Sequence, residues 1–393
     1  MNNSEVIRLT DENIMQTYSR FPVAVKEGRG ATLYDFEDGR YIDFTSGIGV
    51  CSVGYGNEKW VEAVSAQAAA LQHVSNLYYT EPAALLAKRL KERTGMSRVF
   101  FSNSGAEANE GAVKLGRKYS FDKYGEGRST VVTLIQSFHG RTVTTLAATG
   151  QDVFHNYFFP FTEGFRYTPA NDIKALDEAL TGDVCALMIE LIQGEGGVLP
   201  LDKAFVDAAA RLCAERDILL ITDEVQTGVG RTGKLFCFQQ YGVMPDVCSF
   251  AKGIAGGLPF GGIMASAKCA DVLGPGTHAS TFGGNPVCAA GALAVLDILS
   301  DEELKRVSEK GEYIRAGIAK MNAHCVTGVR GMGMMTGVGV NVSHKEIASK
   351  CAENGLLVLT AGKDMVRLLP PLTISYEEID EGLAILRGVL ERA

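Results

Sequence analysis

Several features that would mark other classes of protein are missing from this sequence of 393 residues. It has no apolar run of about 18 residues that could span a bilayer, and no basic cluster that would attract nucleic acid. The net charge is −8, so we expect neither a membrane nor a nucleic acid as partner. The six histidines show no paired ligand spacing, and we expect no metal site. With 46% hydrophobic and 21% charged residues, the composition is that of an ordinary globular protein.

The cysteines also lack a pattern. There are nine of them, an odd number, scattered without a CxxC pair, which favours buried thiols in a reducing compartment over a disulfide framework. The first residues, MNNSEVIRLTDENI, mix acids into a stretch without an apolar core, which argues against a secretory signal or a transit peptide. We therefore expect a cytoplasmic protein.

Apolar strand-like runs alternate with helical patterns between about residues 85 and 279. The runs are VVTLI, CALMIELI, ILLITD and VCSFAK, and KAFVDAAARLCAERD is one of the helical segments between them. This alternation predicts an α/β fold with a mostly parallel sheet covered on both faces. One long helical stretch follows Asn285, then a glycine-rich strand region and a terminal helix. We expect an N-terminal segment over 1–60 that joins a smaller α+β domain over 285–393, and a large domain over 61–284.

Lys252 and Asp223 together suit an aldehyde cofactor such as pyridoxal phosphate. Lys252 stands in the glycine-flanked sequence SFAKGIAGG, and Asp223 ends the apolar run ILLITD. A lysine amine has an ordinary pKa of about 10.4, so it attacks an aldehyde readily only where a buried, apolar or cationic setting lowers that value. A carboxylate beside the pyridine nitrogen keeps that nitrogen protonated and the ring electron-withdrawing. Taken singly, Lys252 reads first as one of many solvated lysines and Asp223 as one of many acids at a strand end.

The segment VFFSNSGAEANEGAVKLGRK predicts a strand that ends at Phe101, a polar turn and a helix. The first N–H groups of a helix are unpaired and lie at the positive end of its dipole, so Gly105 and Ala106 could hold a phosphate. Ser104 would cap this helix. An ordinary helix start would show the same pattern.

Further segments resemble the class III (subgroup II) pyridoxal-phosphate-dependent aminotransferases, and most closely their acetylornithine aminotransferase branch. The resemblance runs from about Tyr18 to the C-terminus and rests on FSNSGAEANEGAVKLGRK, FHGRT, IELIQGEGGV, ITDEVQTGVGRTGKLF, FAKGIAGGLPFGG, STFGGNP and VRLLPPLTIS. It implies fold type I, with pyridoxal 5'-phosphate bound to Lys252 and Asp223 on its ring nitrogen. It also implies a homodimer, in which Thr281 of one subunit reaches the phosphate held by the other.

The same resemblance assigns the other cofactor contacts. Phe138 would lie on one face of the ring, Val225 would cover the other, and Gln226 would bond the phenolic oxygen. Glu190 resembles an acid close to the ring, although Leu191 follows it where the family usually has proline. The expected cofactor-binding residues are therefore Ser104, Gly105, Ala106, Phe138, Asp223, Val225, Gln226, Lys252 and Thr281.

Two arginines and a glutamate indicate the substrate class. A guanidinium binds a carboxylate through two hydrogen bonds, and the resemblance implies that Arg141 of FHGRT binds the substrate carboxylate remote from the amine. Arg367 resembles the arginine that binds the carboxylate near the amine, and Glu195 resembles the residue that pairs with it when the donor has no such carboxylate. Tyr18 and Ile48 align with substrate-pocket positions, and an apolar residue at 48 suits an acylated amine.

A second motif points elsewhere. GVGRTG at 228–233 fits the dinucleotide fingerprint GxGxxG. However, DEVQT separates it from the preceding strand, no clear helix follows it, and Asp246 comes too early for the acid that binds a ribose. A nicotinamide cofactor is therefore not expected.

The resemblance implies a transaminase that moves the terminal amine of N2-acetyl-L-ornithine to 2-oxoglutarate. The products are N-acetyl-L-glutamate 5-semialdehyde and L-glutamate, in arginine biosynthesis. Three alternatives stay open. The donor could be succinylornithine, ornithine, 4-aminobutyrate or an acylated lysine precursor; the chain could be a same-fold aminomutase or decarboxylase; or it could be a binding protein without catalysis.

Overall fold

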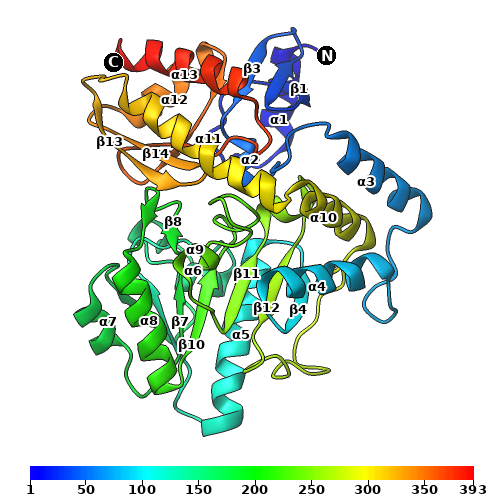
Figure 1. Ribbon diagram of the computed structural model, residues 1–393, viewed down its shortest axis with the longest axis vertical. Coiled ribbons are helices and arrows are strands. Elements are labelled where there is room, and N and C mark those ends of the chain that lie inside the picture. The colour runs from blue at the N-terminus through cyan, green and yellow to red at the C-terminus, as the bar shows by residue number, and fades with distance from the viewer.

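The computed structural model describes residues 1–393, and a large sheet occupies its lower half in Figure 1. Its strands are β4 (Arg98–Ser102), β5 (Thr130–Leu134), β6 (Phe165–Thr168), β7 (Val184–Ile189), β10 (Leu219–Asp223), β11 (Val247–Phe250) and β12 (Gly261–Ala265). Their order is β4-β12-β11-β10-β7-β5-β6. Only β12 runs antiparallel to its neighbours, β11 and β4. The predicted α/β fold with a mostly parallel sheet is confirmed.

Helices cover both faces of this sheet, because successive side chains of a strand point to opposite faces. On one face lies α5 (Gly105–Tyr124), whose Ala112 shares a core cluster with Ile221 of β10. On the other lie α7 (Ile173–Ala179) and α8 (Lys203–Arg216), and Phe205 of α8 shares a core cluster with Leu220. Leu220 and Ile221 are consecutive, so the apolar run ILLITD contributes side chains to the core on both faces of the sheet.

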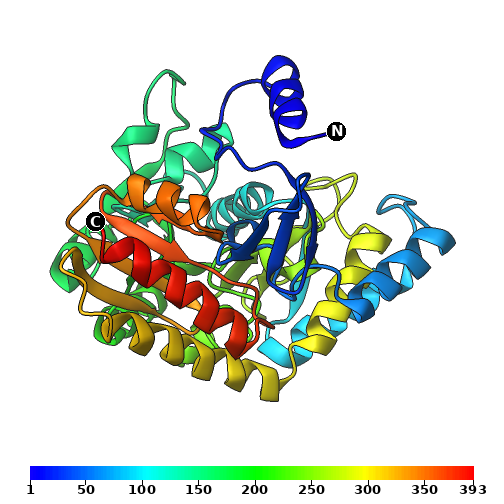
Figure 2. The ribbon, with the colours of Figure 1, turned by 90° about the horizontal axis from the view of Figure 1, so that it is seen from above.

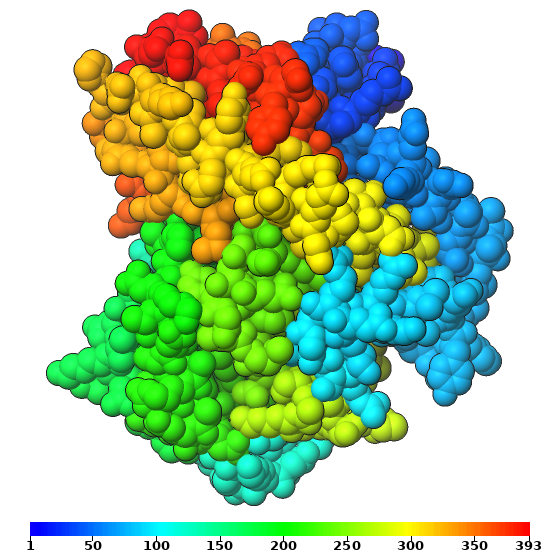
Figure 3. Space-filling model, viewed as in Figure 1, coloured from blue at the N-terminus to red at the C-terminus, as the bar shows by residue number.

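Both ends of the chain build the upper half of Figure 1. The strands β1 (Val25–Arg29), β2 (Thr32–Asp35) and β3 (Arg40–Asp43) form a sheet with β15 (Leu356–Leu357), which pairs in parallel with β3. A second sheet has the order β13-β14-β17-β16, formed by β13 (Val326–Met332), β14 (Met335–Val340), β17 (Met365–Leu368) and β16 (Leu359–Ala361). The helices α11 (Asp301–Ala319), α12 (His344–Glu353) and α13 (Tyr376–Leu390) pack on these sheets. In Figure 3 the two ends of the chain, in blue and in orange to red, likewise form the upper part of the surface, and the middle of the chain, in green, forms the lower part.

The helical stretch after Asn285 is two helices and not one. The first, α10 (Pro286–Ile298), ends before Ser300, whose hydroxyl accepts a hydrogen bond from the Glu303 N–H at 3.3 Å and caps α11. α10 packs against α3 (Glu58–Ala70), α4 (Glu81–Thr94) and the 3-10 turn Lys252–Ala255. The two halves of the stretch therefore serve different neighbours, since α11 packs on β13 and β14.

The N-terminal helix α1 (Asn3–Asn13) stands apart from the body of the molecule (Figure 2), and none of its residues is buried. The remaining short elements are α2 (Ser46–Gly49), α6 (Val143–Ala148), α9 (Phe238–Tyr241), the 3-10 turn Asp152–Phe154, and the paired strands β8 (Ile192–Gln193) and β9 (Leu199–Pro200). None of the helices is long and apolar enough to cross a membrane.

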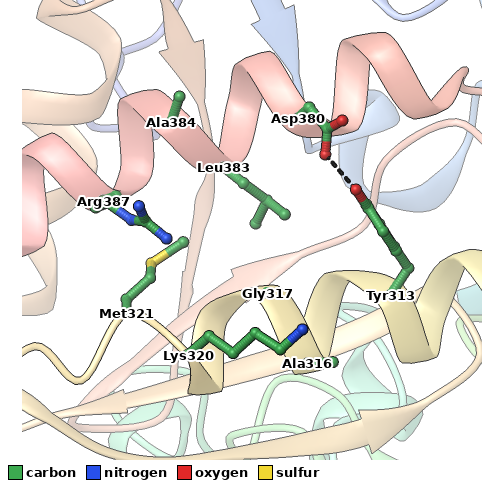
Figure 4. A pocket seen from close by; sticks show the side chains of 9 residues that line it. All are labelled: Tyr313, Ala316, Gly317, Lys320, Met321, Asp380, Leu383, Ala384 and Arg387. Carbon is green, nitrogen blue, oxygen red and sulfur yellow. Dashed lines mark hydrogen bonds between the residues drawn. The ribbon is translucent and has the colours of Figure 1, made fainter.

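A groove of about 300 Å³ separates α11 from α13 (Figure 4). Tyr313 donates a hydrogen bond across it to Asp380 at 2.7 Å. A Cβ on Gly317 would lie 2.8 Å from Leu383 Cδ1, so the glycine permits this close approach of the helices. All charged residues of the groove are exposed, and it lacks the buried titratable groups that mark a catalytic site.

Candidate active site

A cavity of about 640 Å³ lies at the carboxyl edge of the parallel strands, where α/β folds place their ligands. Its wall combines segments that are distant in sequence but follow neighbouring strands. Ser104 follows β4, Phe138 follows β5, Glu190 follows β7, Asp223 ends β10 and Lys252 follows β11. The residues expected from the sequence that line the cavity are Tyr18, Ser104, Gly105, Ala106, Phe138, Arg141, Glu190, Asp223, Val225, Gln226 and Lys252.

Lys252 presents an unpaired amine to this cavity. It begins the 3-10 turn with a φ of 47°, a left-handed conformation that is uncommon for a residue with a side chain. Burial lowers the pKa of Lys252 against the opposing charge of Glu195, and the charge of Arg367 lowers it further. A larger fraction of the amine is therefore neutral and able to attack an aldehyde.

Asp223 is held by three donors. Its Oδ2 accepts hydrogen bonds from Asn109 Nδ2 and His139 Nδ1, both at 2.8 Å, and its Oδ1 accepts one from the Val225 N–H at 3.0 Å. Asn109 Nδ2 also donates to the His139 carbonyl at 2.7 Å. Although burial opposes the shift, the hydrogen bond to Asp223 and its charge raise the pKa of His139. The carboxylate thus has a fixed orientation, and it favours the protonated form of His139.

Asn109 and His139 are two members of this network that the motifs do not assign. Asn109 is 1% exposed on the inner face of α5, and a buried amide needs hydrogen-bond partners. That position was the available signal, since it shares helical spacing with the apolar residues around it. His139 is 2% exposed and its Nε2 has no partner in the protein. Only the fold brings both side chains to Asp223.

The N-terminus of α5 offers free backbone donors. The Ser104 hydroxyl caps the helix by accepting a hydrogen bond from the Glu107 N–H at 3.2 Å. The N–H groups of Gly105 and Ala106 have no acceptor in the protein, as geometry dictates for the first turn of a helix. A Cβ on Gly105 would lie 2.6 Å from Val225 Cγ1. Glycine therefore allows the helix end to reach the cavity wall.

Glu190 holds two pieces of the site in place. Its Oε2 accepts a hydrogen bond from the Phe138 N–H at 2.9 Å, and its Oε1 accepts one from the Gly194 N–H at 3.3 Å. Burial raises the pKa of Glu190 to about 7, against the opposing charge of His139. Leu191, which stands where the family usually has proline, is buried, and its carbonyl accepts a hydrogen bond from the Leu201 N–H at 3.0 Å.

Arg367 and Glu195 form an ion pair beside the cavity. Arg367 is 2% exposed, and its Nη1 donates to Glu195 Oε1 at 2.6 Å and to Gln226 Oε1 at 2.9 Å. Gln226 Nε2 in turn donates to Glu195 Oε1 at 3.3 Å. Although burial opposes the shift, the charge of Arg367 and its hydrogen bond lower the pKa of Glu195. Gln226, which lines the cavity, joins this pair to the cofactor residues.

Arg141 is an exposed cation at the cavity rim. Its Cζ lies 4.1 Å from the ring centroid of Phe154 and 5.6 Å from that of Phe138. It belongs to none of the ion pairs of the structure. A guanidinium held by aromatic rings and free of acids can accept a carboxylate from a substrate.

Ile48 and Thr281 lie outside the cavity wall. Ile48 has a left-handed φ of 66°, and its side chain is 44% exposed. Thr281 is exposed beside Phe282, a ring that is 58% exposed. Tyr18 does line the cavity but is 72% exposed. The outer rim of the site is therefore open in a single chain.

Lys252, Asp223 and the N-terminus of α5 thus meet in one cavity. Known proteins have sequences similar to that of this chain. The family described as aminotransferase class-III matches residues 14–390. The chain belongs to this family. Class III aminotransferases depend on pyridoxal phosphate, and transaminase chemistry follows from that membership.

Relatives match over almost the whole chain. The acetylornithine aminotransferase of Haemophilus ducreyi is 48% identical over 99% of both chains. That of Caldanaerobacter subterraneus is 47% identical over 96% of this chain and 97% of its own. Among solved structures, the ornithine aminotransferase of Toxoplasma gondii has a TM-score of 0.95 at 31% identity, covering 99% of this chain and 95% of its own. The N-acetylornithine aminotransferase of Stenotrophomonas maltophilia has a TM-score of 0.85 at 36% identity, covering 98% of each.

The residues that line the cavity match the chemical groups of pyridoxal phosphate. The unpartnered N–H groups at the start of α5 suit the phosphate, and Phe138 and Val225 line the same cavity as that helix end and Lys252. Asp223, buried and fixed by its donors, suits the ring nitrogen. A crystal structure of the Toxoplasma enzyme, 30% identical to this chain, records partial occupancy of pyridoxal phosphate at its active site.

Proposed function

We propose that this aminotransferase moves the terminal amine of N2-acetyl-L-ornithine to 2-oxoglutarate, producing N-acetyl-L-glutamate 5-semialdehyde and L-glutamate in arginine biosynthesis. The observation that carries the proposal is the ion pair of Arg367 with Glu195 beside the cavity of Lys252. The names of relatives 42 to 48% identical to the chain support the choice of donor.

Pyridoxal phosphate supplies an aldehyde that captures amines and a ring that withdraws electrons from the reacting carbon. Lys252 holds the cofactor between turnovers. With a substrate amine in its place, the Lys252 amine would be free to take a proton from the substrate carbon that bears the amine and to pass it to the former aldehyde carbon of the cofactor. The lowered pKa of Lys252 serves both tasks, because each needs the neutral amine.

Arg367 lets one site accept two unlike substrates. Acetylornithine has no carboxylate on the carbon that carries its terminal amine, so Glu195 can keep its bond to Arg367 while this donor reacts. Glutamate does carry such a carboxylate, and it can replace Glu195 as the partner of the guanidinium. A buried arginine without either anion would be costly. Arg141, unpaired at the rim, suits the remote carboxylate of either substrate.

We also propose that the enzyme is a homodimer whose subunits complete each other's sites. Thr281 lies in an apolar surface around Asn76, whose side chain donates hydrogen bonds to the carbonyls of Ser280 and Gly283. Leu77, Tyr78, Tyr79 and Phe282 are all more than half exposed there, and such a patch favours an interface. In the dimer Thr281 would reach the partner's phosphate.

The absence of disulfides among the nine cysteines supports a reducing, cytoplasmic setting.

Mixing two inactive variants tests the shared site. Lys252→Ala and Thr281→Ala subunits, dissociated and reassociated together, should recover about one quarter of the parental activity, because about half of the dimers are mixed and each has one intact site. Unmixed variants are the control. If the mixture stays as inactive as its components, Thr281 does not act across an interface.

Ornithine is the second candidate donor, because ornithine aminotransferases share the fold at TM-scores up to 0.95. A panel of acetylornithine, succinylornithine, ornithine, 4-aminobutyrate and an acylated lysine precursor, each against 2-oxoglutarate and ranked by kcat/KM, decides between the donors. Glutamate formation with acetylornithine in the lead supports the proposal. A clear lead for another donor rejects the substrate, and carbon dioxide release without glutamate rejects the transaminase in favour of a decarboxylase.

A further inference from the structure

The motif GVGRTG, at which we expect no nicotinamide cofactor, places an unusual arginine in the interior. Arg231 is 2% exposed, and no acid lies within ion-pair distance of it. Its Nη1 donates to the carbonyls of Pro370 at 2.6 Å and Met334 at 3.1 Å, and its Nη2 donates to the Ser46 hydroxyl at 3.4 Å. Burial lowers the pKa of Arg231 to about 9. A cation buried at such a cost is bonded only to neutral groups.

The acceptors of Arg231 lie at one end of the strand pair that carries Arg367. Met334 immediately precedes β14, and Pro370 follows β17. The two strands are antiparallel, with Thr336 opposite Leu368 and Gly337 opposite Arg367. Arg231 therefore ties both strands together at the end nearest Arg367. Its own carbonyl adds a fourth link, since it accepts a hydrogen bond from the Met334 N–H at 2.9 Å.

The third acceptor brings in the N-terminal segment. The Ser46 hydroxyl donates to the Leu369 carbonyl at 2.6 Å, and the Leu369 N–H donates to the Phe44 carbonyl at 2.7 Å. The Leu372 N–H likewise donates to the Ser52 carbonyl at 2.7 Å. The residues after Arg367 are thus fastened to the segment 44–52, and Arg231 lies at their junction.

We infer that Arg231 is a positioning residue: it fixes the end of the β14–β17 pair against the N-terminal segment, and thereby sets the place of the Arg367 guanidinium for the α-carboxylate of glutamate and 2-oxoglutarate. The inference rests on the proposed function, in which Arg367 binds that carboxylate. Weakening the hydrogen bonds of Arg231 to Met334, Pro370 and Ser46 would move Arg367. Glutamate binding depends on Arg367 because the guanidinium contacts the α-carboxylate directly. A donor without an α-carboxylate depends on it much less.

Single turnovers of the holoenzyme test the inference. In Arg231→Met the apparent affinity for glutamate should fall about ten-fold, the loss expected when hydrogen bonds from a charged group are removed. The half-reaction with acetylornithine should stay within about three-fold of the parent by the same scale. Arg231→Lys, which keeps the charge and can still reach one carbonyl, should recover part of the affinity for glutamate.

Arg128→Met is the control, because Arg128, although only partly buried, also donates only to carbonyls, those of Val184, Arg216 and Asp217, away from the cavity. It should lower the melting temperature without separating the two half-reactions. Equal losses in both half-reactions of Arg231→Met, or losses no greater than those of the control, overturn the inference.

Two further measurements keep the outcome decisive. If Arg231→Met does not fold, Ser46→Ala removes one acceptor of Arg231 together with the hydrogen bond to the Leu369 carbonyl. It should shift the affinity for glutamate in the same direction by a smaller factor; no shift, or an equal loss with both substrates, overturns the inference. The parent protein is tested first with glutamate, because amine transfer from every candidate donor to 2-oxoglutarate forms glutamate. A parent that does not react with glutamate rejects the proposed function and this inference with it, whereas a reacting parent with an unaltered variant rejects the inference alone.

Discussion

Replacing Glu195 with glutamine should separate the two halves of the reaction. In the parent, Glu195 Oε1 lies 2.6 Å from Arg367 Nη1, and the arginine is 2% exposed. Breaking a buried ion pair costs about 3 to 5 kcal/mol. The cost should be smaller here, because the Glu195 side chain is 28% exposed and Gln226 remains as an acceptor for Arg367 at 2.9 Å. We therefore expect the substitution to cost about 1.4 to 2.8 kcal/mol in the half-reaction that needs the ion pair. The half-reaction with acetylornithine should therefore slow about ten- to a hundred-fold.

The half-reaction with glutamate should not slow in the same variant, because its carboxylate has to displace Glu195 from Arg367. Stopped-flow absorbance of the holoenzyme, in single turnovers with each substrate, measures both. Glu303→Gln is the control, since Glu303 forms a comparably buried ion pair with Lys310 away from the cavity; it should leave the ratio of the two rates unchanged. Equal slowing with both substrates in Glu195→Gln would refute the exchange of partners at Arg367.

Three further changes have defined outcomes. Gly105→Ala puts a Cβ 2.6 Å from Val225 Cγ1 and should weaken cofactor binding about ten-fold or more in a fluorescence titration, whereas Gly111→Ala in the same helix meets nothing closer than 3.4 Å and should leave it unchanged. His139→Gln should lower the free energy of unfolding most below about pH 6.5; because the folded-state pKa of His139 is raised, the difference from the parent should shrink as pH rises through that pKa. A loss that is independent of pH contradicts this charge. Ser300→Ala removes the cap of α11 and should lower that free energy by about 1 kcal/mol in urea titrations; no change would mean that the break before α11 does not depend on the cap.

The strands that build the site are predictable, and their order in the sheet is not. ILLITD and VCSFAK are apolar runs closed by polar residues, and they become β10 and β11 with Asp223 and Lys252 at their ends. The antiparallel course of β12 has no counterpart in the sequence, because GGIMA does not record its direction. The division of α10 from α11 did leave a signal: Ser300 precedes Glu303 by three residues, the spacing of a helix cap.

The site divides in a similar way. The residues expected to contact cofactor or substrate could be named from the motifs, whereas the roles of Asn109 and His139, which stand in the same motifs, emerge only from their contacts with Asp223. Asn109 lies 114 positions before Asp223 and His139 lies 84 before it, so no local pattern joins them. For Ile48 the contact with substrate stays a prediction of the resemblance, because its side chain is 44% exposed and does not line the cavity of the single chain.

The parallel pairing of β15 with β3 has a consequence for how the protein is made. Leu356 lies beside Ile42, and Leu357 beside Asp43, so the sheet at the beginning of the polypeptide cannot acquire its last strand until the ribosome has translated nearly the entire message. The seven-stranded sheet has no such dependence, since all its strands have emerged once Ala265 leaves the exit tunnel. A transcript truncated before codon 356 would therefore yield a chain that has every strand of the seven-stranded sheet but lacks β15 and, with β17, the strand that carries Arg367.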